Sequence, residues 1–184
     1  MPVPLPQLLR ENAPQPINRA PSPALALTLP WLMVMLGSLS PLLPLIASAP
    51  VVPPFGFLTM LAWQQLRPRL FPVWAGFPLG LFDDLYSGQP FGSAAVLWSL
   101  AILVLDLVEY RVPWRNFLQN WVIAVGLLLA YALLAASFAN VDGGLRNLTV
   151  LGPQLVLSVL LMPLLGRIAA LADRVRLLPL RRLD

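Results

Sequence analysis

The chain contains no cysteine, no histidine and no lysine. Without cysteine it forms no disulfide and offers no thiolate, and without histidine it lacks the commonest general base and zinc ligand. Serine and aspartate remain, but they form no recognisable arrangement of nucleophile and base. We therefore predict that the protein is not an enzyme and has no catalytic residues, no metal site and no cofactor.

Charged residues are scarce as well. They make up 11% of the 184 residues, whereas hydrophobic residues make up 58%. A soluble domain carries about a quarter of its residues as charged groups, so this surface is expected to face lipid. Because the apolar runs are continuous and do not alternate, they favour helices over a β-barrel. The fold class that follows is an all-α integral membrane protein.

Six apolar runs are candidate transmembrane helices, since about 20 apolar residues are needed to cross a bilayer. They cover residues 25–47, 51–66, 70–87, 91–108, 116–139 and 148–171. The second run is short and opens with Pro53 and Pro54, so it could instead form a re-entrant hairpin with the end of the first. That alternative would leave five spans in the same compact bundle.

The bundle is expected to occupy residues 24–172. Residues 1–23 contain seven prolines, which remove backbone donors and prevent a regular helix, so they predict a disordered tail. Residues 173–184 predict a second tail, which is basic. Its arginines favour contact with anionic membrane lipid, with docking of a cytoplasmic partner as the alternative.

All twelve basic residues are arginines, and they lie between the apolar runs. If six helices cross, eleven arginines lie on one side of the bilayer and only Arg146 lies on the other. Basic residues are enriched on the cytoplasmic side, so both termini are predicted to be cytoplasmic. A re-entrant second run leaves this orientation unchanged. The arginines form no stripe that could follow phosphates, so no nucleic-acid partner is expected despite a pI near 10.7.

Two acidic residues at the end of the fourth run, one inside it and one just beyond it, need partners, because charges within a membrane span are costly. Asp106 and Glu109 are three residues apart and share one face of the predicted helix. We expect Glu109 to pair near the membrane interface. Candidate partners of Asp106 are Arg67, Arg69, Arg115 or a second protein.

A stripe of small residues leads to a third acid. Gly76, Gly80 and Asp84 recur at intervals of four and share one helix face, and the two glycines allow another backbone to approach closely. Asp84 is then expected to face protein, and Asp83 is expected to point away from it. Because Gly88 and Pro90 predict a tight turn just beyond, Asp84 can accept hydrogen bonds from the free N–H groups of that turn.

Residues 80–92, GLFDDLYSGQPFG, resemble the signature of the MreD rod shape-determining family, which reads approximately G-L-x-x-D-L-x-x-G-x-P-x-G. Asp84 falls on its aspartate, Pro90 on its proline, and Gly80, Gly88 and Gly92 on its glycines. Chain length, span number and the basic C-terminal end are also similar to that family. The long proline-rich N-terminal segment is not typical of it.

The resemblance implies a scaffold subunit of the bacterial cell-elongation complex in the inner membrane. Such a subunit would bind MreC, contact MreB and peptidoglycan synthases indirectly, and support lateral peptidoglycan synthesis and cell shape. The family's fold is similar to the substrate-binding membrane subunits of vitamin-uptake transporters, so a small-molecule carrier subunit is the alternative. The residues implied to form a structural turn or a partner contact are Gly76, Gly80, Asp84, Gly88, Pro90 and Gly92. The sequence leaves the partner surface and homo-oligomerisation open.

Overall fold

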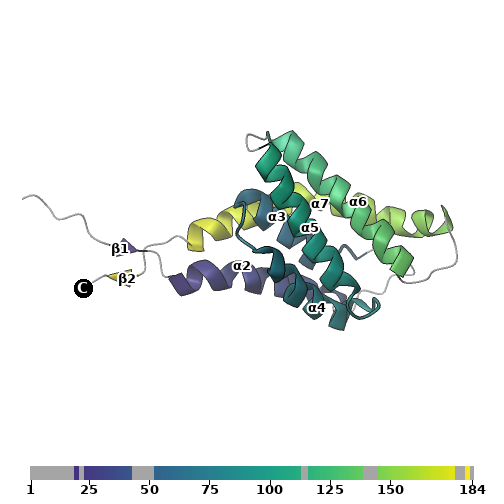
Figure 1. The fold of residues 1–184 in the computed structure, drawn as a ribbon, viewed down its shortest axis with the longest axis horizontal. Coiled ribbons are helices and arrows are strands. Elements are labelled where there is room, and N and C mark those ends of the chain that lie inside the picture. Colours follow the sequence, from purple (N-terminus) through teal and green to yellow (C-terminus); the bar gives the residue numbers. More distant parts are fainter. Residues whose placement is uncertain are drawn as a thin grey trace, which may run out of the picture.

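The computed structural model describes residues 19–20, 23–42, 52–112, 116–138, 145–176 and 181–182. Within these residues the protein is helical, apart from one pair of two-residue strands (Figure 1). The helices are α2 (Pro23–Ser38), α3 (Phe55–Leu66), α4 (Gly76–Ser87), α5 (Ser93–Arg111), α6 (Phe117–Phe138) and α7 (Leu145–Arg176). The 3₁₀ turn η1 (Ser40–Leu42) follows α2, and the 3₁₀ turn η2 (Val73–Ala75) precedes α4.

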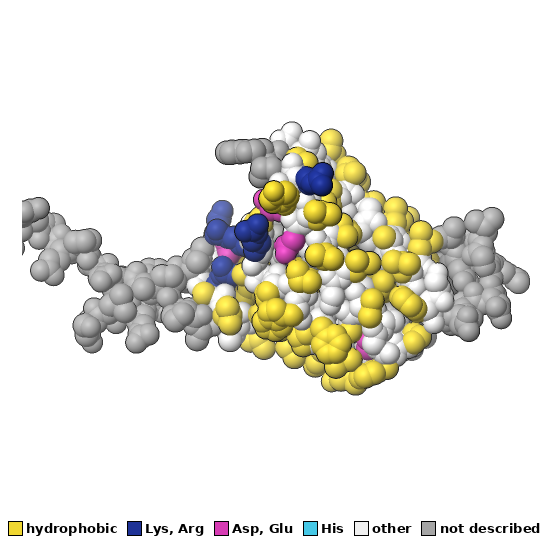
Figure 2. All heavy atoms as spheres, in the orientation of Figure 1, with side chains coloured by type: hydrophobic (Ala, Val, Ile, Leu, Met, Phe, Trp, Pro, Cys, Tyr) yellow, Lys and Arg dark blue, Asp and Glu magenta, His cyan; other side chains and the backbone are white. Residues whose placement is uncertain are grey.

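Three of these helices are long and apolar enough to cross a membrane, namely Ser93–Arg111, Phe117–Phe138 and Leu151–Arg176. Their outer faces are apolar: Leu103, Leu133 and Leu160, one from each helix, are all more than half exposed. Figure 2 shows hydrophobic side chains over most of the visible face. An apolar surface of this extent is typical of a protein that faces lipid. The all-helical prediction is confirmed, and three helices have the length and composition needed to cross a membrane.

The prediction of six complete spans is not confirmed. α3 and α4 contain 12 residues each, or about 18 Å of helix, whereas the hydrocarbon core of a bilayer is about 30 Å thick. α2 belongs to a shorter apolar segment, Ala26–Leu42. The re-entrant alternative depends on residues 43–51, which lie outside the described residues.

α3 forms the centre of the bundle. Every residue from Gly56 to Gln64 is buried, and the helix packs against α2, α5, α6 and α7. Prolines account for its short length. Pro54 is the N-cap residue, and Pro68 disfavours a helical conformation at Arg67 (φ −131°, ψ 89°), where the helix ends. The second apolar run therefore folds as a short helix surrounded by protein.

α4 and α5 form a helical hairpin with the most extensive contact between any two helices in the described part of the chain. The predicted glycine stripe lies in this contact. A Cβ atom on Gly76 would lie 2.5 Å from the backbone N and Cα of Ser99, and one on Gly80 would lie 2.5 Å from the carbonyl oxygen of Ala94. Only glycine allows the two backbones to come this close.

One end of the molecule is basic. The strands β1 (Arg19–Ala20) and β2 (Arg181–Arg182) pair in antiparallel register, with Arg19 opposite Arg182, so the segments before α2 and after α7 lie side by side (Figure 1). In Figure 2 the arginine side chains on the visible face gather toward this same end. α7 continues to Arg176, so the predicted boundary of the basic tail at residue 173 falls inside a helix.

The glycine packing yields a stability prediction. Gly80→Ala places a methyl group against the α5 backbone, which cannot move without disturbing the hairpin, so we expect the variant to lose about 2 kcal/mol of stability. Gly126→Ala is the matched control, because no atom lies within 4 Å of a Cβ at that helical glycine. Thermal unfolding in detergent should show a lower Tm for Gly80→Ala alone. Equal Tm values for the two variants would contradict the close packing.

Candidate functional site

The carboxylate of Asp84 joins the end of α4 to the start of α5. Its Oδ2 accepts hydrogen bonds from the backbone N–H of Gly92 (2.8 Å) and Ala95 (3.4 Å), and its Oδ1 accepts from the N–H of Ala94 (3.0 Å) and the hydroxyl of Ser93 (3.3 Å). The first N–H groups of a helix have no partners within that helix, and they form the positive end of its dipole. Because the N-cap residue Gly92 has no side chain to fill this role, Asp84 of the preceding helix caps α5.

The turn between the two helices has the geometry that this cap requires. Gly88 (φ +70°) and Gly92 (φ +94°) both adopt left-handed conformations, which glycine adopts at little cost. The carbonyl of Pro90 accepts a hydrogen bond from the N–H of Ser93 (3.0 Å). The turn thereby directs the first N–H groups of α5 back toward Asp84, and the glycines and proline of the motif act together with its aspartate.

Asp83 does not point away from protein. It is 7% exposed and lies near Ser38 of α2 and Tyr131 of α6. The prediction was wrong because it allowed α4 only one packed face. α4 contacts both α2 and α5, so two adjacent residues that point about 100° apart can both meet protein.

A polar cluster joins Asp83 to Tyr131. Ser38 lies near Asp83, and Gln89 and Trp98 lie near Tyr131. The amide Nε2 of Gln89 donates to the Tyr131 hydroxyl (3.2 Å), and the Tyr131 ring stacks on Phe57 with 4.3 Å between centroids. Sequence reasoning missed Ser38, Gln89 and Tyr131, which come from different elements. A tyrosine well inside the apolar run 116–139 was the signal that could have drawn attention to this cluster.

A second polar cluster lies toward the basic end, around Gln64 of α3. Its Nε2 donates to Oδ1 of Asp106 (3.0 Å) and to the carbonyl oxygen of Phe71 (3.3 Å), and its Oε1 accepts from the N–H of Phe71 (3.0 Å). Among the described residues the hydrogen-bond partner of Asp106 is thus a neutral amide. Arg115 lies outside the described residues, so pairing of Asp106 with Arg115 or with a second protein stays a prediction. Glu109 follows one turn later on α5 and is partly buried.

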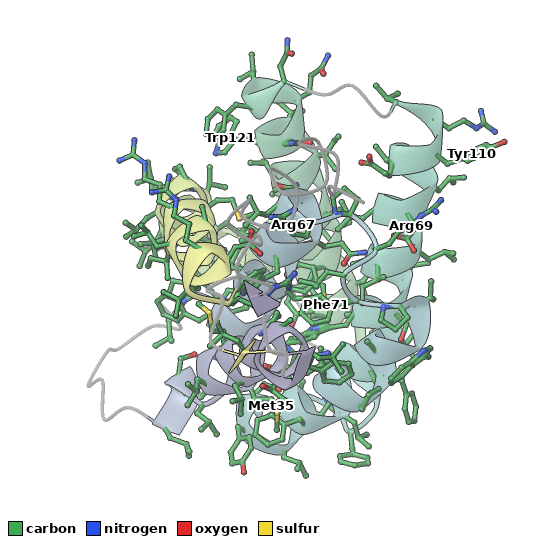
Figure 3. The ribbon with its side chains drawn as sticks, turned by 90° about the vertical axis from the view of Figure 1, so that its left-hand side faces the viewer. Met35, Arg67, Arg69, Phe71, Tyr110 and Trp121 are labelled. Carbon is green, nitrogen blue, oxygen red and sulfur yellow. The ribbon has the colours of Figure 1, made fainter. Side chains whose placement is uncertain are left out.

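An ion-pair cluster connects α3 to the end of α7. Oδ2 of Asp173 accepts hydrogen bonds from Nη2 (2.7 Å) and Nε (3.0 Å) of Arg67, and Arg176 lies 3.5 Å from Oδ1. The guanidinium of Arg176 is also 5.8 Å from the centre of the Trp63 ring. Figure 3, which views this end of the bundle, shows Arg67 among the helices. Asp173 is 6% exposed, and sequence reasoning missed its role because it placed Asp173 in a tail.

Comparisons of the chain with protein-family models, with curated proteins and with solved structures found no match.

The geometry indicates a structural role for the motif. Both Asp84 oxygens already accept hydrogen bonds from the start of α5, and no group of three acidic residues suited to a metal ion occurs in the described ranges. The Gly80, Gly88 and Gly92 positions determine the shape of the hairpin. Of the two predicted uses of these residues, the structure shows the turn. Gly76, Gly80 and Asp84 are buried, whereas Gly88 and Pro90 are exposed, so a partner contact at the turn stays a prediction.

The two adjacent aspartates should respond differently to substitution. Asp84→Ala leaves backbone N–H groups without acceptors inside the bundle, and we expect a loss of about 3 kcal/mol of stability. Asp83→Asn should change stability by about 1 kcal/mol or less, because Asp83 accepts no backbone hydrogen bond from the described residues. Thermal unfolding in detergent measures both. A larger effect at Asp83 than at Asp84 would refute the assignment of the cap to Asp84.

Proposed function

We propose that the protein is a non-enzymatic scaffold subunit of the bacterial cell-elongation complex, embedded in the inner membrane with both termini in the cytoplasm. The observation that supports this most is that the residues resembling the MreD signature form one structural unit. Gly80 packs against α5, Asp84 caps it, and Gly88 and Gly92 shape the turn. A chance set of glycines in a membrane protein has no reason to converge on one carboxylate.

The internal pairing of the acids favours a scaffold over a carrier. Asp84 bonds to the α5 backbone, Asp106 to Gln64, and Asp173 to Arg67, so these charges hold helices together and are not directed at a solute. The cavity beside Tyr131 measures about 90 Å³, well below the roughly 300–1,000 Å³ of small-molecule sites. A larger space of about 330 Å³ has mainly apolar walls and lies between α6 and α7, and neither Asp84 nor Asp106 lines it. These observations give the vitamin-type carrier no specific support.

The buried residues of the motif, Gly76, Gly80 and Asp84, are not available to bind MreC, whereas Gly88 and Pro90 are exposed in the turn. MreC is a single-pass protein, so its helix would pack on a lipid-facing surface. The outer faces of α5 and α6 offer such a surface, with Leu103, Leu107 and Val122 all more than half exposed. In lipid, van der Waals packing between such faces can support helix association.

The proposed orientation can be tested with single cysteines, because the chain contains none of its own. Phe91 in the α4–α5 turn is 69% exposed and Tyr110 near the end of α5 is 76% exposed. We expect a membrane-impermeant maleimide to label Phe91→Cys in intact spheroplasts, and Tyr110→Cys only after the membrane is permeabilised. The opposite labelling pattern would mean that the termini lie outside.

The proposed role predicts a cell-shape phenotype. Depletion of the protein from a rod-shaped host should produce round cells, because lateral wall synthesis would lose its membrane scaffold. A copy carrying Asp83→Asn should restore rods, whereas Asp84→Ala should not, and affinity capture of the functional copy should recover MreC. Microscopy and immunoblots for protein level provide the readouts. Normal rods after complete depletion would rule out the proposal.

A further inference from the structure

A groove of about 330 Å³ lies between the first turns of α6 and the second half of α7, with the end of α3 as its floor. Its apolar walls include Leu66, Phe117, Trp121 and Met162. α7 carries Pro163 and Gly166 along the groove, and a Cβ placed on Gly166 would have no atom within 4 Å. A side chain at residue 166 would therefore have room to occupy this space.

The polar side chains that line the groove include one cation and no acid. Arg167, an exposed residue, contributes the only charged side chain of the lining, and it has no ion-pair partner among the described residues. The Oδ1 atom of Asn120 is buried without a hydrogen-bond partner there. Gln65 donates to the Asn120 carbonyl oxygen (2.8 Å), which fixes α3 against α6. No acidic residue lines the groove.

The groove lies where both lipid chains and lipid headgroups can reach it. It opens between two helices with apolar outer faces, so its walls continue the lipid-facing surface of the protein. It also lies toward the basic end of the bundle, where Figure 3 shows Trp121 on α6, on the side toward α7. Tryptophan and arginine are both favoured at the level of the lipid headgroups.

We propose that this groove binds an anionic phospholipid, with part of one acyl chain between α6 and α7 and the headgroup phosphate at Arg167. An apolar channel with a single unpaired cation complements an amphiphile that carries one negative charge. The volume is at the lower end of those found for ligand sites, so only part of the lipid enters. This inference requires the membrane location alone and is independent of the scaffold role.

The fluorescence of Trp121, which lines the groove, reports whether lipid enters it. The full-length protein is reconstituted in phosphatidylcholine vesicles that contain a small fraction of phosphatidylglycerol or phosphatidylcholine with brominated acyl chains, since bromine quenches tryptophan on contact. The difference between the wild type and Trp121→Phe isolates the fluorescence of this residue. We expect brominated phosphatidylglycerol to reach half-maximal quenching at about a fivefold lower fraction, the size expected for one arginine close to an anionic headgroup.

Two pairs of variants separate the groove from the general surface. Arg167→Gln should abolish the preference for phosphatidylglycerol, whereas Arg174→Gln, which removes an exposed arginine outside the groove, should keep it. Gly166→Leu should fill the groove and reduce quenching by both lipids. Gly126→Leu makes the same change at an equally open glycine on α6 and should leave quenching unchanged.

Three results would overturn the proposal. Equal quenching by the two lipids in the wild type would mean that Trp121 contacts only bulk lipid. Equal loss of preference in Arg167→Gln and Arg174→Gln would assign the effect to diffuse surface charge. No quenching of Trp121 by either lipid would mean that protein covers the groove. The arginine variants keep the test decisive even if Gly166→Leu fails to fold.

Discussion

The contact between the Asp84 carboxylate and the first N–H groups of α5 is the constraint on which the arrangement of the other helices depends. It holds α4 and α5 at the short distance that Gly76 and Gly80 permit. The fixed hairpin then presents α4 to α2 and α5 to α3 and α6. A carboxylate is suited to this position because it accepts several hydrogen bonds at once and carries the charge that a helix N-terminus favours.

The polar contacts of α3 also satisfy groups at a helix end. Helix ends expose backbone groups that lipid cannot satisfy, so a helix too short to reach water needs protein partners at its ends. Gln64 bonds to both backbone groups of Phe71 just beyond the end of α3, and Asp106 completes its hydrogen bonding. Arg67, the C-cap residue of the same helix, is held by Asp173. The buried polar residues are thus concentrated where short helices end.

Patterns local in sequence predicted the local structure. Hydropathy predicted the all-helical fold, and the spacing of Gly76, Gly80 and Asp84 predicted the face that packs against another backbone. Contacts between distant segments could not be read in this way. Gln64 and Asp106 are 42 residues apart, and Arg67 and Asp173 are 106 apart. Nothing near either acid in the sequence indicates its partner. Hydropathy also overstated the lengths of α3 and α4, because proline residues shorten a helix without making the segment polar.

The short central helix α3 has a consequence for how the protein enters the membrane. Insertion into a bilayer is decided largely by the length and apolarity of each segment as it leaves the ribosome. α3 has 12 residues, with Gln64 and Gln65 in its last turn and Arg67 as its C-cap, so it is a poor candidate for insertion on its own. Apart from the bonds between Gln64 and Phe71, the hydrogen bonds of these three side chains reach α5, α6 and α7. The centre of the bundle would therefore be completed last, after the long helices that follow it in the chain have been synthesised.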